Sequence, residues 1–164
     1  MFQTALQAGL CPAKEEQALI PGKNYRPADV FLPNWRNGRS TCVDITIVSS
    51  LQQALVEKAA DSPGAALEHA LQRKNNQSKE DCEREGLEFL AMPVEVLGGF
   101  AKQSVEVVER LGRQLARQTG GDISKVINHL FQRLSIILMK YNSALITSRN
   151  PTFPNEMIDG DRET

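Results

Sequence analysis

The sequence predicts a mixed domain of α/β (α+β) type, in which a small mixed central sheet is flanked by helices. Two short β-like runs, at 28–32 and 41–48, lie close together in the chain, and a third apolar run follows at 87–97. Segments with helical periodicity separate and follow these runs. The pattern predicts one domain over 1–146. It also predicts a disordered tail over 147–164, which is rich in Pro, Asn, Ser, Asp and Glu.

The first part of the chain leads into the two neighbouring strands. Residues 1–10 favour a short helix, and a polar bend with a short apolar run follows it. Pro33 is expected to end the first strand, because proline cannot donate to a strand ladder. Asn37-Gly38 is a strong hairpin signal, within a loop that we expect to be longer than two residues. The second strand is the best in the sequence, since it is dense in β-branched residues.

A long helix is predicted over about 64–84, after a short helix that Ser49-Ser50 would cap. Gly86 is expected to end the long helix. Its inward-facing stripe contains Leu67, Ala70, Leu71, Lys74, Ser78 and Cys82.

The third strand contains Pro93, which indicates a bulge or an edge position, and Gly98-Gly99 turns the chain after it. An amphipathic helix is predicted over 100–118. The last helix begins at a cap, either Asp122 or Ser124, and runs to about Ile146. The residues expected to face inward from the helix at 100–118 are Val105, Val108, Leu111 and Leu115.

Composition limits the classes of protein. The chain has 164 residues, 41% hydrophobic and 24% charged, with a formal net charge of −1. Any contact with nucleic acid would therefore have to rely on a local group of basic residues, because the net charge creates no positive field over the whole protein. Cys11, Cys42 and Cys82 form neither a disulfide framework nor a zinc pattern, so we expect free thiols in a reducing compartment. With no membrane-spanning run and no signal peptide, an intracellular location, nucleus or cytoplasm, is expected rather than secretion.

Two carboxylates in strand-like surroundings need an explanation. Asp29 and Asp44 each lie in a β-like run, although aspartate is disfavoured in strands and costly to bury unpaired. On adjacent strands, the two residues suggest either a site for a divalent metal or a matched set of ion pairs.

Lys74 adds a third member to this group. It lies on the apolar stripe of its helix, between Ala70 and Leu71, where a lysine needs an acidic partner or a polar cleft. Because this helix follows the Asp44 strand, its inner face should pack on the sheet that carries the aspartates. The alternative for Lys74 is that its amine extends to solvent.

Such a group suits metal-assisted hydrolysis of a phosphodiester. Mg²⁺ prefers oxygen ligands, keeps several waters and uses one or two carboxylates. A bound metal lowers the pKa of a water and offsets charge on the phosphate. A lysine beside it would orient the water or stabilise the transition state.

The residues around these strands resemble a known family. Arg26-Pro27-Ala28-Asp29, followed by Asp44-Ile45-Thr46, looks like the PD-(D/E)xK nuclease signature. The chain resembles in particular the restriction-like endonuclease-type domains at the C-terminal ends of reverse transcriptases in some non-LTR retrotransposons. The segments that carry the resemblance are 8–16, 19–22, 26–35, 44–48, 92–100, 132–135 and 141–142.

The resemblance implies roles for single residues. Asp29 matches the first metal-binding aspartate and Asp44 the second acid, so both would hold Mg²⁺ or Mn²⁺. Thr46 stands where the short motif has its lysine. In the retrotransposon nucleases the lysine is on the following helix, in a Lys-x-x-(Lys/Arg)-Tyr pattern, and Lys74 matches it. Gln77-Ser78 replaces the basic residue and the tyrosine of that pattern.

Three functions follow as hypotheses. The first is a metal-dependent DNA endonuclease domain that nicks target DNA, with DNA and the remainder of a reverse transcriptase polyprotein as partners and no membrane. The second is a catalytically decayed retroelement fragment that acts as a non-enzymatic binding module or has no function. The third is a purely structural domain, which predicts that the two aspartates are far apart or that each faces an arginine, such as Arg26 or Arg39.

Several further residues are candidates for roles in the site or in the structure. Glu15 is a candidate third ligand from the N-terminal region, and Glu95 is either an added acid near the site or an edge-strand charge. Trp35, beside two arginines, either stacks on nucleic acid or anchors a loop. His69 and His129 have no partner at ligand spacing, so we expect structural or surface roles for them.

Overall fold

A four-stranded mixed sheet forms the centre of the structure, a computed structural model that describes residues 1–15, 19–23 and 25–149. The elements are α1 (Phe2–Gln7), β1 (Ala13–Lys14), β2 (Val30–Arg36), β3 (Arg39–Val48), α2 (Val56–Asp61), α3 (Ala65–Arg84), β4 (Glu88–Glu95), α4 (Lys102–Thr119) and α5 (Ile123–Arg149). Within these residues, no helix combines the length and apolar character needed to cross a bilayer.

The strands lie in the order β1-β2-β3-β4. β1, β2 and β3 are antiparallel neighbours, whereas β4 pairs with β3 in parallel. The parallel pair needs a long crossover, which α2 and α3 supply. The expected small mixed sheet with flanking helices is therefore confirmed, and β1 is an additional short strand that the sequence did not indicate.

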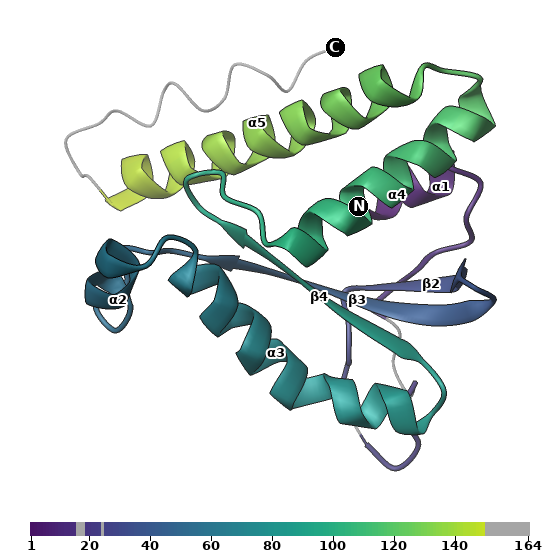
Figure 1. The fold of residues 1–164 in the computed structure, drawn as a ribbon, viewed down its shortest axis with the longest axis horizontal. Helices are drawn as coiled ribbons and strands as arrows, with labels where there is room; N and C mark the ends of the chain where they lie inside the picture. The colour runs from purple at the N-terminus through teal and green to yellow at the C-terminus, as the bar shows by residue number, and fades with distance from the viewer. Residues whose placement is uncertain (16–18, 24, 150–164) are drawn as a thin grey trace.

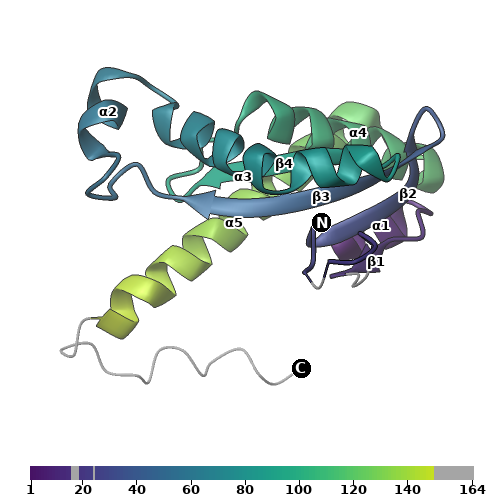
Figure 2. The ribbon, with the colours of Figure 1, turned by 90° about the horizontal axis from the view of Figure 1, so that it is seen from below.

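Helices cover both faces of this sheet (Figures 1 and 2). On one face, α3 packs over Cys42, Phe89 and Ala91 through its own Cys82. On the other face, α4 and α1 pack over the larger core cluster, to which α5 adds Leu138. The sheet residues of that larger cluster are Val30, Leu32, Trp35, Val43, Met92 and Val94.

The β2–β3 hairpin differs from the expectation in two ways. Arg36 pairs with Arg39, so the connection has only two residues, Asn37 and Gly38. Both have positive φ, 52° and 75°, as a tight hairpin turn of this kind requires. The strand also continues past Pro33, because the register shifts between Leu32 and Arg36 and a bulge tolerates proline.

Some boundaries of the helices and strands agree with those predicted from the sequence, and others differ. α3 ends before Gly86, and Pro93 lies on β4, an edge strand, as expected. The short helix α2 begins only at Val56, after turns rather than directly after Ser49-Ser50. Asp122 rather than Ser124 caps α5, because its Oδ1 accepts a hydrogen bond from Lys125 N at 2.8 Å.

The end of α5 corrects the predicted tail. The helix continues to Arg149, so residues 147–149 are helical rather than disordered. The rest of the predicted tail, 150–164, lies outside the described residues.

Gly112 brings α4 and α5 close together. A Cβ at this position would lie 2.6 Å from Ile127 Cγ1 and 3.3 Å from Ile127 Cα. The closer contact is with the Ile127 side chain, and the contact with its backbone adds to the crowding. Glycine in the middle of a helix is otherwise unfavourable, which indicates that this close approach requires it.

We predict that Gly112→Ala lowers the free energy of unfolding by about 1–3 kcal/mol, because overpacking outweighs the gain in helix propensity. Urea unfolding followed by circular dichroism would measure the change. In the Gly112→Ala background, Ile127→Ala should cost less than it does in the wild type, because the crowded side chain is removed. Additive effects of the two substitutions would contradict the crowding.

Candidate functional site

Asp44 and Lys74 meet between β3 and α3. Side chains alternate along β3, so Asp44 lies on the same face as Cys42, the face that α3 covers. Lys74 Nζ lies 2.9 Å from Asp44 Oδ2 and 3.2 Å from Oδ1. The side chain of Lys74 is 20% exposed, and that of Asp44 is 10% exposed. The expectation that Lys74 faces the sheet is confirmed, and the alternative in which it extends freely to solvent is wrong.

Asp29 joins this pair from the beginning of β2. It lies one residue before the strand rather than inside it, which corrects the sequence expectation. Its Oδ2 accepts a hydrogen bond from Ile45 N at 2.7 Å. The main-chain pairing between β2 and β3 extends only to Val30 and Val43, so the carboxylate takes the place of the next ladder partner.

The two carboxyl groups are close enough to influence each other. Burial is the main cause that raises the pKa of Asp44 above its ordinary value of 3.8, and Lys74 opposes this shift. The charge of Asp29, and a hydrogen bond that the two carboxyl groups can share when one is protonated, raise it further. Asp29, Asp44 and Lys74 therefore converge, which argues against the hypothesis of two separate aspartates that each face an arginine.

The donor set is consistent with a hard divalent cation. Asp29 and Asp44 supply carboxylate oxygens, and Mg²⁺ needs only one or two such ligands because it keeps several waters. Oδ1 of Asp29 is not used in the hydrogen bond to Ile45. Among the described residues, no group of three or more His, Cys, Asp or Glu side chains is placed to hold a metal. Any cation here would rest on two protein carboxylates and on water.

The two additional candidate acids, Glu15 and Glu95, have other partners or positions than the group of Asp29, Asp44 and Lys74. Glu15 forms an ion pair with Arg26, although its backbone N–H donates to Asp29 O at 3.0 Å. Glu95 pairs with Val48 in the register of β3 and β4, four residues beyond Asp44, or about 13 Å along the strand. Its interpretation as an edge-strand charge fits this position.

A hydrogen-bonded group beside Lys74 was not evident from the sequence. Tyr25 Oη donates to Asp81 Oδ2 at 2.8 Å, and Lys23 forms an ion pair with the same carboxylate. Burial, followed by the hydrogen bond to Asp81, raises the pKa of Tyr25 to about 12. Ser78, one turn after Lys74, lies near the Tyr25 hydroxyl and opposes the rise of its pKa. These contacts hold the segment before Asp29 against α3. The sequence signal for these contacts is the position of Ser78, a polar residue, on the apolar stripe of its helix.

The remaining singled-out residues have structural or surface positions. Cys42 and Cys82 are buried free thiols beside each other, and Cys11 is an exposed free thiol. His69 and His129 are exposed, as expected. Trp35 is only 5% exposed and belongs to the core, so it anchors its strand rather than presenting a free stacking face.

The raised pKa of Asp44 predicts a pH dependence of stability. Its folded pKa lies above its unfolded pKa, so the folded state binds more protons in the window that starts near 3.8. The contribution of Asp44 to stability therefore falls as pH rises through this window. Urea unfolding at pH values from about 4 to 7 should show the wild type losing stability relative to Asp44→Asn as pH rises. A constant difference between the two proteins would contradict this assignment.

Comparisons of the chain with protein-family models, with curated proteins and with solved structures gave no match. The function therefore has to be argued from the geometry of Asp29, Asp44 and Lys74. That argument rests on two carboxylates, one just before β2 and one in the middle of β3, and on one amine from α3.

Proposed function

We propose that this chain is a metal-dependent DNA endonuclease-like domain of a retroelement, of the PD-(D/E)xK restriction-like type, which hydrolyses a phosphodiester bond. The single observation that carries the proposal is the convergence of Asp29, Asp44 and Lys74 from three separate parts of the sequence. The family resemblance matches the same three residues. DNA is the proposed substrate, and the remainder of a reverse transcriptase polyprotein is a proposed partner.

Asp29 and Asp44 would hold Mg²⁺ or Mn²⁺. When bound, the cation would lower the pKa of a coordinated water and offset negative charge on the phosphate. The hydrogen bond from Ile45 N fixes the direction of the Asp29 carboxylate. The packing of α3 on β3 and β4 fixes the Asp44 side of the site.

Lys74 would have two successive roles. Without a cation, its ammonium neutralises the buried charge of Asp44. When a cation takes over that task, the ammonium becomes available to a phosphate oxygen or to the attacking water, close to where negative charge develops. The lysine therefore keeps the carboxylate ionised and in place before the cation arrives.

A second candidate is a catalytically decayed fragment that acts as a non-enzymatic binding module. Lys74 contacts both oxygens of Asp44, so the charge of Asp44 is compensated without a cation. Gln77 and Ser78 also replace the basic residue and the tyrosine of the family pattern. These observations favour the second candidate if cation binding is not found.

We predict that Asp44→Ala lowers Mg²⁺-dependent nicking of supercoiled plasmid DNA by at least about 100-fold, because one of two cation ligands is lost. Agarose gels would measure the conversion to open circles, and circular dichroism would verify that the variant is folded. Glu95→Gln is the matched control, since it also removes one acid from a neighbouring strand and should retain nicking. Unchanged nicking by folded Asp44→Ala would refute the assignment of this residue.

Cation binding provides a separate test that does not depend on turnover. Isothermal titration of the purified wild type with MnCl₂ should show binding, and Asp29→Asn and Asp44→Asn should each weaken it by at least about 10-fold. Because a proton competes with the cation for Asp44, affinity should also fall as the pH is lowered. No detectable Mn²⁺ or Mg²⁺ binding by the wild type would favour the non-enzymatic alternative.

A further inference from the structure

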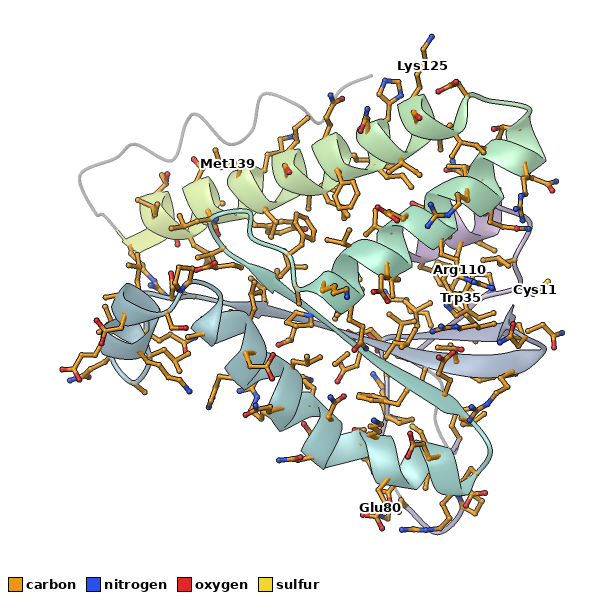
Figure 3. The ribbon with its side chains drawn as sticks, viewed as in Figure 1. Cys11, Trp35, Glu80, Arg110, Lys125 and Met139 are labelled. Atoms are coloured by element: carbon orange, nitrogen blue, oxygen red, sulfur yellow. The ribbon has the colours of Figure 1, made fainter. Side chains whose placement is uncertain are left out.

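An arginine-lined cleft lies at the end of the sheet away from α2, between the β2–β3 hairpin and α4. Figure 3 shows Arg110 and Trp35 side by side at this place, with Cys11 nearby. The cleft has a volume of about 270 Å³. Its lining residues are Leu10, Asn34, Trp35, Arg110, Arg113, Gln114 and Arg117. Three of these residues are cations and none is an acid.

Arg110 is held in a fixed orientation. Its guanidinium carbon lies 5.4 Å from the centre of the Trp35 ring, in a cation–π arrangement. Its Nε and Nη2 donate to Trp35 O at 3.1 and 2.9 Å. Both of these partners, an aromatic ring and a carbonyl oxygen, are neutral, so neither offsets the positive charge of the guanidinium. The entropy of ordering this side chain is thus already lost before any ligand binds.

Arg113 and Arg117 lie on the same face of α4 as Arg110, because they follow it by three and seven residues. Arg113 Nη2 lies 2.9 Å from Glu109 Oε2, an exposed pair that contributes little to stability. In the part of the chain that the structure describes, Arg117 forms no ion pair. The cleft therefore concentrates positive charge in a chain whose formal net charge is −1.

The positive surface continues beyond the cleft. Trp35, Arg110 and Arg113 also line an adjoining hollow that contains Arg36. Arg36 in turn shares a third hollow with Arg39. We call these three adjoining hollows the arginine strip; its arginines are Arg36, Arg39, Arg110, Arg113 and Arg117. The acids that line the strip or pair with its arginines are Glu88, Glu106 and Glu109, so the five arginines outnumber them. Both hydrogen-bonding geometry and charge along the strip suit a row of anions.

We propose that this cleft binds backbone phosphates of DNA. The inference rests on the proposed function for its partner, and it adds a contact surface that is separate from the carboxylates. Arginine is suited to phosphate because its planar guanidinium can donate two parallel hydrogen bonds. The volume of the cleft is below the range of about 300–1,000 Å³ that is typical of sites enclosing a small molecule. A phosphate group on a continuous strand fits such an open cleft better than a whole nucleotide does.

The position of the cleft defines its role. Trp35 lies six residues beyond Asp29, or about 20 Å along β2. Trp35 also packs with α4, whereas Asp44 faces α3. A phosphate bound beside Arg110 is therefore not the one that is cleaved. The cleft would hold the DNA away from the cleaved phosphate and would supply local affinity that the net charge cannot.

Fluorescence anisotropy with a labelled 20-base-pair duplex, in EDTA, would test this role without any cleavage. Arg113→Ala/Arg117→Ala should bind about 10-fold more weakly at low salt, and the slope of log affinity against log salt should become shallower by about 2. Arg117→Glu, a single surface change, should weaken binding by a similar factor. Lys58→Ala/Lys140→Ala is the matched control, because it removes two exposed cations from α2 and α5 and should retain the wild-type slope.

The outcomes separate the cleft from the nuclease. Weak binding by the cleft variants, together with absent nicking by the wild type, would support the cleft and refute only the endonuclease. Wild-type affinity and slope in both cleft variants would overturn the cleft, whatever the nicking activity. An equal loss in the control would also overturn it, since overall charge would then explain the binding. Titration with inorganic phosphate that occupies the arginines while the duplex does not bind would overturn DNA as the partner.

Discussion

The ion pair between Asp44 and Lys74 is the interaction on which the arrangement of the site depends. It joins the middle of a central strand to the helix that covers it, at a place where Cys42, Phe89 and Ala91 form apolar surroundings. A buried carboxylate would be costly without the ammonium, and removal of one partner of a buried pair typically costs about 3–5 kcal/mol. Two apolar side chains of similar volume would nevertheless often be as stable. Stability alone therefore does not explain why this pair is polar, and that is the physical reason to consider chemistry.

Asp29 shows how the same site also organises the sheet. β2 is too short to cover the whole of β3, so the amide of Ile45 lies beyond the last paired residue, Val43. The Asp29 carboxylate accepts its hydrogen bond, and the backbone carbonyl of Asp29 accepts one from Glu15 N. One residue thus connects three neighbouring segments. Because its Oδ2 is directed at a backbone amide, the carboxylate has a fixed position beside Asp44, and no described lysine or arginine forms an ion pair with it.

The sequence was informative where periodicity and local chemistry decide the structure. The inward position of Lys74 follows from helical spacing, and its approach to Asp44 follows from the connection between β3 and α3. Local preference was misleading at Pro33, because the bulge that accommodates this proline depends on pairing with β3. The position of Asp29 before β2, and the arginine cleft, depend on contacts between segments far apart in the sequence. No spacing within β2 or α4 shows that Arg110 stacks on Trp35.

The two faces of the sheet offer different environments to an anionic polymer. On the α3 face, two carboxylates are close to a single ammonium, so negative charge is in excess and the site does not attract DNA without a cation. On the α4 face, exposed guanidinium groups surround an open cleft and can exchange water for phosphate at low cost. A carboxylate site repels phosphate until a cation binds, whereas the arginines attract it at all times. If both sites bind one DNA molecule, the arginines would act first and would raise the local concentration of phosphate near the carboxylates. Affinity and chemistry would then be provided by different helices of the same small domain.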